Sequence, residues 1–116
     1  MSHDPIIDKS TYFALRDSMG AEFMDELVDT YLNDTPNQIT ALRDALHKGD
    51  AELFRRAAHS IKSTSLNFGA VPLADKAREL ENRGRDGRLD GAGGEVDSLS
   101  QAFALVCEQL EALKNE

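Results

Sequence analysis

Apolar residues in this sequence recur in steps of three and four, and this spacing restricts the fold more than any other feature. Such steps place side chains on one face of an α-helix. No alternating β-branched run is long enough to predict a strand. We therefore expect an all-α fold: an antiparallel four-helix bundle with a short additional N-terminal helix, in a single domain over residues 1–116. The two longest stripes are Val28, Leu32, Thr35, Ile39, Leu42 and Leu46, and then Val96, Leu99, Phe103, Val106, Leu110 and Leu113.

Capping residues, glycines and prolines predict where the helices begin and end. A first helix is expected to start at Asp8 or Ser10, to turn Phe13 inward and to end at Gly20. The following stripe stays in phase across Pro36, which favours one kinked helix. A second helix capped by Thr35 is the alternative.

Glycines also divide the second half of the chain. Gly49-Asp50 should end one helix and cap the next, which is predicted over residues 51–68. Gly69 should end that helix, and Pro72 should open another. The glycine-rich segment 84–94 is predicted to be a flexible loop before the last helix.

Composition and charge exclude several classes of protein. The chain has 116 residues, with 13 Lys and Arg against 21 Asp and Glu, so its net charge is −8. An acidic chain is a poor ligand for nucleic acid or for an anionic membrane surface. The longest apolar run, residues 102–107, is too short to span a bilayer, and residues 1–10 lack the pattern of a secretory signal, so we expect none. Together with the single cysteine, Cys107, this pattern predicts a cytoplasmic protein.

His59 is expected on the face of the third predicted helix that points away from the core. At about 100° per residue, Ala57, Ile61 and Phe68 fall opposite His59. The His59 face instead carries Arg55, Arg56, Lys62, Ser63 and Leu66. The surrounding segment 51–88 has 8 basic and 5 acidic residues, a net charge of +3 within an acidic chain.

The side chains around His59 indicate which chemistry this histidine can perform. Histidine side chains titrate near pH 6.5, so a neutral ring offers a nitrogen lone pair at neutral pH. A metal site would need another ligand at position i+3 or i+4, where Lys62 and Ser63 stand. A general base normally needs a pocket, which a convex helix face does not provide. The cations favour an anion attached to His59.

The sequence around His59 resembles a known family. The run Ala58-His59-Ser60-Ile61-Lys62-Ser63 precedes Asn67-Phe68-Gly69-Ala70 and Leu80-Glu81. This arrangement is similar to the histidine-containing phosphotransfer (HPt) domain, whose pattern is Ala-His-x-Leu-Lys-Gly followed by Gly-Ala and Leu-Glu. Residues 31–34 and 42–50 also resemble that family. The similarity covers residues 20–85 well and the remainder loosely. Ile61 replaces the usual leucine, and Ser63 replaces the usual glycine.

The resemblance implies a stand-alone phosphocarrier in a multistep two-component phosphorelay. His59 would accept a phosphoryl group from an aspartate of one receiver domain and pass it to another. The partners would be receiver domains of a hybrid sensor kinase and of a response regulator. Mg²⁺ would belong to the receiver, and this chain would need no cofactor or metal of its own. We expect a monomer that binds neither nucleic acid nor membrane and is not an enzyme, since no nucleotide-binding glycine motif is present.

Each residue near His59 has an expected role under this interpretation. Lys62 and Arg55 would balance the charge of the phosphoryl group. The partner would contact Arg56, Ser63, Leu66, Asn67 and Gly69, although Gly69 could serve only as a helix terminator. Solvated side chains remain an equal alternative for the two arginines.

Other titratable residues favour structural roles. His47 is expected to complement a helix C-terminus, and His3 should lie in a loose terminus. Cys107 should be a small core residue, and Asp25, Glu26 and Asp29 should form a solvated helix face. Two competing functions are a helical adaptor that binds a receiver domain or partner helix without carrying phosphate, and an enzyme that uses His59 as a general base.

Overall fold

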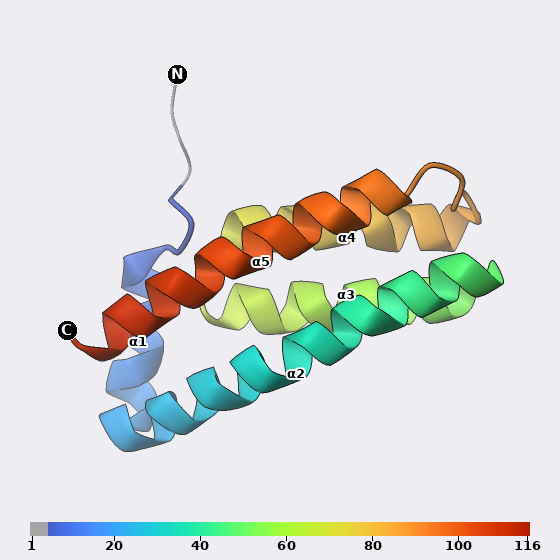
Figure 1. Ribbon diagram of the computed structural model, residues 1–116. Helices are drawn as coiled ribbons and strands as arrows, with labels where there is room; N and C mark the ends of the chain where they lie inside the picture. Colours follow the sequence, from blue (N-terminus) through green and yellow to red (C-terminus); the bar gives the residue numbers. More distant parts are fainter. Residues whose placement is uncertain (1–4) are drawn as a thin grey trace.

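Five α-helices make up the regular structure of the chain (Figure 1). The computed structural model describes residues 5–116, and it contains no strand within that range. The helices are α1 Lys9–Met19, α2 Ala21–Lys48, α3 Ala51–Asn67, α4 Val71–Asp86 and α5 Gly93–Lys114. The predicted all-α class is confirmed.

The four longer helices form an antiparallel bundle, and α1 covers one of its ends (Figure 1). There α1 lies beside the start of α2 and the end of α5. The Arg16 Nη1 atom donates a hydrogen bond of 2.9 Å to the Glu116 carbonyl oxygen. The two helices with the most extensive mutual contact are α3 and α4, whose relative position therefore matters most for any site between them.

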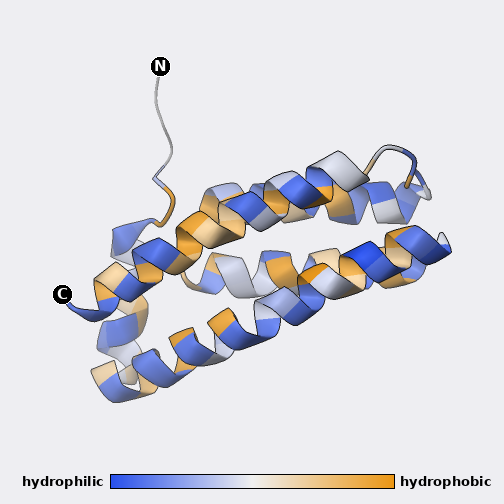
Figure 2. Cartoon of the chain, in the orientation of Figure 1, coloured by the Kyte–Doolittle hydropathy of each residue, from blue (hydrophilic) through white to orange (hydrophobic). Residues whose placement is uncertain are grey.

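Apolar faces of the helices meet in one continuous core (Figure 2). The stripe predicted for residues 96–113 is buried along its whole length on α5. On α2, the stripe is buried at Val28, Thr35, Ile39 and Leu42 and half-buried at Leu32 and Leu46. Burial of these stripes holds the bundle together, since apolar area removed from water is the main favourable term in folding.

Helix ends lie where the capping residues predict them. The Asp8 carboxylate caps α1 by accepting from Ser10 N–H at 3.2 Å, and Asp50 caps α3 by accepting from Leu53 N–H at 3.0 Å. Gly20 ends α1, and Gly49 ends α2 in the left-handed region with φ of 69°. Within α1, Tyr12 is completely buried, whereas Phe13 is only half-buried, so the inward residue is the neighbour of the one predicted.

Helix α2 passes through Pro36 without a break, so the expectation of one continuous helix is confirmed and a second helix capped by Thr35 is not found. Proline has no N–H and cannot donate the usual bond to the preceding turn. Just before it, the Thr35 hydroxyl donates to the Tyr31 carbonyl oxygen at 2.7 Å. Pro36 itself is exposed, and its ring therefore does not disturb the core.

The glycine-rich segment is shorter and more ordered than the sequence predicts. Helix α4 continues through Gly84 to Asp86, and α5 begins at Gly93, so the loop is confined to residues 87–92. Gly84 is helical because it packs directly on α3. A Cβ at this position would lie 2.9 Å from the backbone nitrogen and Cα of Arg55. This glycine therefore serves close helix packing and not flexibility.

No helix among residues 5–116 is both long and apolar enough to cross a membrane.

Candidate functional site

His59 lies in the middle of α3 with its side chain 54% exposed. On the opposite face of the helix, Ala57, Ile61 and Phe68 are buried in the core. The prediction that His59 points away from the core is therefore confirmed. The imidazole is nevertheless anchored on one side.

Glu81 of α4 holds the inner nitrogen of the His59 ring. Its Oε2 atom lies 2.7 Å from His59 Nδ1. The Glu81 side chain is only 5% exposed, so this carboxylate is a buried charge beside a surface histidine. Buried charges of this kind normally need partners.

Lys62 is the second partner of Glu81. The Lys62 Nζ atom donates to Glu81 Oε1 at 2.7 Å, and the lysine side chain is 20% exposed. Burial alone would raise the pKa of Glu81. The hydrogen bonds from Lys62 and His59 outweigh that effect and lower this pKa below its usual value. Glu81 is therefore ionised at neutral pH.

An ionised Glu81 determines where the hydrogen of a neutral His59 ring resides. A carboxylate can only accept hydrogen bonds, so Nδ1 must carry the hydrogen that Glu81 accepts. The lone pair is then on Nε2, the nitrogen farther from Glu81. The Ser63 hydroxyl, one turn further along α3, lies 3.5 Å from Nε2. The arrangement presents a single oriented nucleophilic nitrogen at the surface.

Helix packing places Glu81 under His59. Leu80 and Ala77 of α4 are buried in the core. Gly84, one turn after Leu80, allows α4 to approach the α3 backbone at Arg55. Because α3 and α4 approach so closely, the short Glu81 side chain reaches both His59 and Lys62.

The two arginines before His59 both bind Glu52 instead of turning toward the imidazole. Arg55 makes two hydrogen bonds to the Glu52 carboxylate, at 2.6 and 3.1 Å, and Arg56 makes one at 3.2 Å. The hydrogen bond from Arg55 is the main cause that lowers the pKa of Glu52 to about 2. Both arginines remain one turn from His59 on its face of α3.

The predicted contact residues beyond His59 differ in exposure. Ser63, Leu66 and Asn67 are exposed on α3, and the exposed fraction of Leu66 is 39%. Gly69 is instead buried, and its carbonyl accepts a hydrogen bond from Asp8 N–H at 2.8 Å. With φ of 79° and Asp8 directly above it, Gly69 is placed for turn formation and packing and not on the surface that His59 shares.

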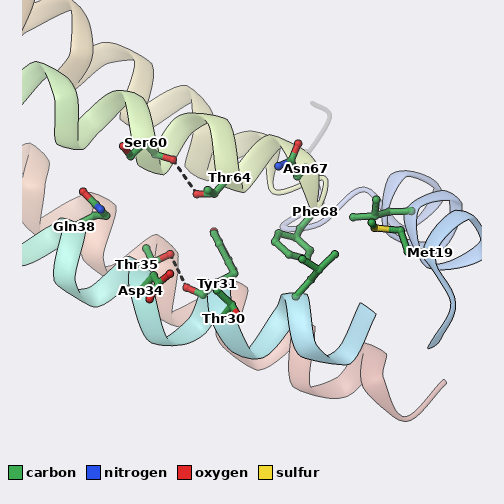
Figure 3. A pocket seen from close by; sticks show the side chains of 12 residues that line it. Met19, Thr30, Tyr31, Asp34, Thr35, Gln38, Ser60, Thr64, Asn67 and Phe68 are labelled. Atoms are coloured by element: carbon green, nitrogen blue, oxygen red, sulfur yellow. Dashed lines mark hydrogen bonds between the residues drawn. The ribbon is translucent and has the colours of Figure 1, made fainter. Parts of the chain in front are cut away.

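A groove runs between α2 and α3 (Figure 3). Its volume is about 590 Å³, and most of its lining is apolar. Polar side chains of α2 and α3 face one another across it, while α1 closes one end. Its walls include Leu15 and Met19 of α1, Leu27, Tyr31, Asp34 and Gln38 of α2, and Ser60, Thr64 and Asn67 of α3.

The remaining candidates lie away from this site. His47 lies in the last turn of α2, the position expected for it. Cys107 is half-buried, and burial raises the pKa of its thiol. Asp25, Glu26 and Asp29 lie on the outer part of α2, and His3 lies outside the described residues. Within residues 5–116, no cluster of His, Cys, Asp and Glu is arranged to hold a metal ion.

Sequence reasoning missed two parts of the site. Glu81 is part of the Leu80-Glu81 pair that carries the family resemblance, but its contact with His59 depends on how α3 packs against α4. A glutamate at the edge of an apolar stripe was the available signal. The groove depends on how three helices pack together, and no local pattern predicts it.

Comparisons with known proteins agree on one family. The model of the Hpt domain matches residues 26–116. The phosphorelay protein LuxU of Vibrio vulnificus is 23% identical over 82 residues, which is 71% of either chain. The crystal structure of histidine-containing phosphotransfer protein B (HptB) of Pseudomonas aeruginosa PAO1 superposes with a TM-score of 0.90. It shares 32% sequence identity, and the match covers 97% of both chains.

Proposed function

Because this chain belongs to the Hpt domain family and is a histidine phosphotransfer protein of a phosphorelay, we propose that His59 is the residue that carries the phosphoryl group. The observation that supports His59 most directly is its hydrogen bond from Nδ1 to the buried Glu81 carboxylate. This bond leaves the lone pair on Nε2 and the ring edge open to solvent. His47 has no comparable partner among the hydrogen bonds of residues 5–116.

The transfer step uses this oriented nitrogen. The Nε2 lone pair attacks the phosphorus of an aspartyl phosphate on a receiver domain. A bond forms between Nε2 and phosphorus, the bond from phosphorus to the aspartate oxygen breaks, and the aspartate leaves as a carboxylate. Nδ1 keeps its hydrogen, and the positive charge that develops on the ring lies against Glu81. Return of the phosphoryl group to another aspartate reverses these steps.

Lys62 and Arg55 supply the cationic surroundings of the phosphoryl group in this proposal. Lys62 Nζ is already fixed by Glu81, so it needs little reorganisation as charge arrives. Arg55 is oriented by Glu52 and contributes a longer-range positive potential. Phosphoryl transfer depends mainly on such positioning and charge stabilisation, with little covalent assistance.

Receiver domains are the partners, and we place their docking surface on the groove beside His59. Ser60 and Thr64 line this groove on the same helix that carries His59. The exposed Met19 lines the groove, and the exposed Leu66 adds an apolar side chain on the His59 face of α3, as interaction sites commonly do. Arg56, Ser63 and Asn67 form the polar rim. One receiver would belong to a hybrid sensor kinase and the other to a response regulator, and the receiver would bring the Mg²⁺.

The protein would act as a stoichiometric carrier in the cytoplasm. Each chain then moves one phosphoryl group at a time without hydrolysing nucleotide, and it works as a monomer. The acidic bulk of the chain, with net charge −8, also disfavours nucleic acid as a partner.

Phosphoryl transfer from a labelled receiver tests the assignment of His59. Incubation with the phosphorylated receiver should place acid-labile, base-stable label on the wild-type chain. His59→Gln should abolish the label, whereas His47→Gln, which changes a histidine at the end of α2, should retain it. Label that persists in His59→Gln would contradict the assignment. Receiver binding without any transfer to the wild type would instead favour an adaptor.

A further inference from the structure

We propose that the Ser63 hydroxyl donates a hydrogen bond to the phosphoryl group on His59 and so shifts the phosphorelay equilibrium toward this chain. The inference rests on the proposed function of His59. It assigns Ser63 a direct contact with the reacting group, beyond a place on the docking rim. The family pattern has glycine at this position, so the hydroxyl is a feature that this chain adds.

The position of Ser63 on α3 brings its hydroxyl to the nucleophilic edge of the imidazole. Ser63 follows His59 by four residues, and side chains with that spacing are neighbours on a helix surface. Its Oγ lies 3.5 Å from Nε2, at the outer limit of a hydrogen bond. Glu81 holds the ring from the other side at Nδ1, which keeps Nε2 turned toward the solvent edge where Ser63 lies.

The Ser63 hydroxyl is free to turn toward this edge. Thr64, the next residue, donates its hydroxyl to the Ser60 carbonyl oxygen at 2.9 Å, and Ser65 pairs with the buried Tyr31 hydroxyl at 2.7 Å. In the part of the chain that the structure describes, the Ser63 hydroxyl has no polar partner other than His59. A donor that is exposed and otherwise uncommitted gains most from an anion placed beside it.

Phosphorylation changes what the hydroxyl can reach. On the free ring, the only acceptor is the Nε2 lone pair, and its distance from Oγ makes the bond weak. After transfer, phosphoryl oxygens project beyond Nε2 and bring charged acceptors closer to Ser63. Hydrogen bonds to charged groups are stronger than those to neutral groups. The hydroxyl therefore stabilises phosphorylated His59 more than free His59.

The equilibrium partition of label between this chain and a receiver domain measures the effect. Ser63→Ala removes the hydroxyl and should shift the partition toward the receiver about three- to tenfold, less than for a buried charged hydrogen bond because solvent screens this exposed site. Ser63→Thr keeps a hydroxyl and should restore most of the wild-type partition. Ser98→Ala, which removes a hydroxyl bonded to Lys76 between α4 and α5, is the matched control and should leave it unchanged.

Two further measurements separate this role from others. The dissociation constant for the unphosphorylated receiver should change much less than the partition in Ser63→Ala, because an exposed rim hydroxyl contributes little to docking and the proposed bond exists only with the phosphoryl group present. A partition for Ser63→Ala within about 1.5-fold of the wild-type partition would overturn the proposal, because loss of the hydrogen bond should shift it further. So would a partition change matched by an equal change in receiver binding. Absence of label from wild-type His59 would instead refute the proposed function itself.

Discussion

Replacement of Glu81 by glutamine should weaken His59 as a nucleophile while leaving the bundle folded. The amide has the shape of the carboxylate and fills the same buried position, where the side chain is 5% exposed. Its oxygen can still accept from Lys62. Its NH₂ group then faces His59 Nδ1 and can satisfy the ring only by donating to it. The ring hydrogen consequently moves to Nε2, the nitrogen that attacks phosphorus in the proposed transfer step.

The size of the effect follows from the bond that is lost. Glu81 accepts from Nδ1 at 2.7 Å, and this bond strengthens as the ring becomes positively charged during transfer. A hydrogen bond to a charged group contributes about 1.5–3 kcal/mol, and 1.4 kcal/mol corresponds to a factor of ten. We therefore expect Glu81→Gln to slow transfer about 10- to 100-fold and to lower the free energy of unfolding by about 1–3 kcal/mol, which leaves the bundle folded.

Two assays check this reasoning. Rapid-quench transfer from a phosphorylated receiver gives the rate, and ¹⁵N NMR of the imidazole gives the position of the ring hydrogen. Wild type should show hydrogen on Nδ1, and Glu81→Gln should show it on Nε2. Glu79→Gln, an exposed glutamate on the same helix, is the control. A transfer rate within threefold of wild type, with the ring hydrogen still on Nδ1, would refute the role given to Glu81.

Acid titration of stability gives an independent check on the same carboxylate. Glutamate in an unfolded chain titrates near pH 4.5, and the Lys62 and His59 hydrogen bonds lower the pKa of Glu81 in the folded chain despite its burial. A lowered pKa contributes stability that is complete above pH 4.5 and is lost as the pH falls through the folded value. The difference in free energy of unfolding between wild type and Glu81→Gln should therefore shrink on acidification below pH 4.5. A difference that is independent of pH would contradict the lowered pKa.

Two further substitutions test the helix packing and the docking surface. Gly84→Ala should destabilise the bundle by about 1–3 kcal/mol in urea titrations, because its Cβ would lie 2.9 Å from the Arg55 backbone. Gly94→Ala, at a helical position with nothing within 4 Å, should not destabilise it, and equal losses in both variants would refute the packing argument. Thr64→Arg should weaken receiver binding about tenfold or more by filling the groove, an effect of the size seen for hot-spot changes. Thr40→Arg, on an exposed site of α2 outside the groove, should bind normally in the same titration, and unchanged binding by Thr64→Arg would remove the groove as the docking surface.

Most of the fold could be predicted from the sequence because helix formation and capping depend on residues close together in the chain. Asp50 and Gly49 mark helix ends because capping bonds and left-handed turns involve only near neighbours. The position of His59 opposite the core follows from helix periodicity alone. By contrast, Gly84 looks like a loop residue in sequence, since its role depends on the backbone of another helix. Other contacts between helices could not be predicted either, because they also depend on residues far apart in the sequence.

In the candidate site, too, contacts within one helix were predictable and contacts between helices were not. His59 and Lys62 were predictable because both lie on one face of one helix. Glu81 completes the site from α4, and its burial between two partners arises only when α3 and α4 pack. Arg55 was expected near the phosphoryl group, but its pairing with Glu52 orients it along the helix. The three-residue spacing of that pair was visible in the sequence and could have predicted the competition.

The close approach of α3 and α4 at Gly84 also bears on which motions the site permits. The backbones are pressed together at Arg55, about one helical turn from both His59 and Glu81. Relative movement of two helices is smallest near the point where they touch. Amide hydrogens around this crossing should therefore exchange with solvent only through global unfolding, while those of the loop at residues 87–92 exchange by local opening. The His59 imidazole would thus keep its position relative to Glu81 between encounters with receiver domains. Each receiver domain would then bind the same arrangement of the two side chains.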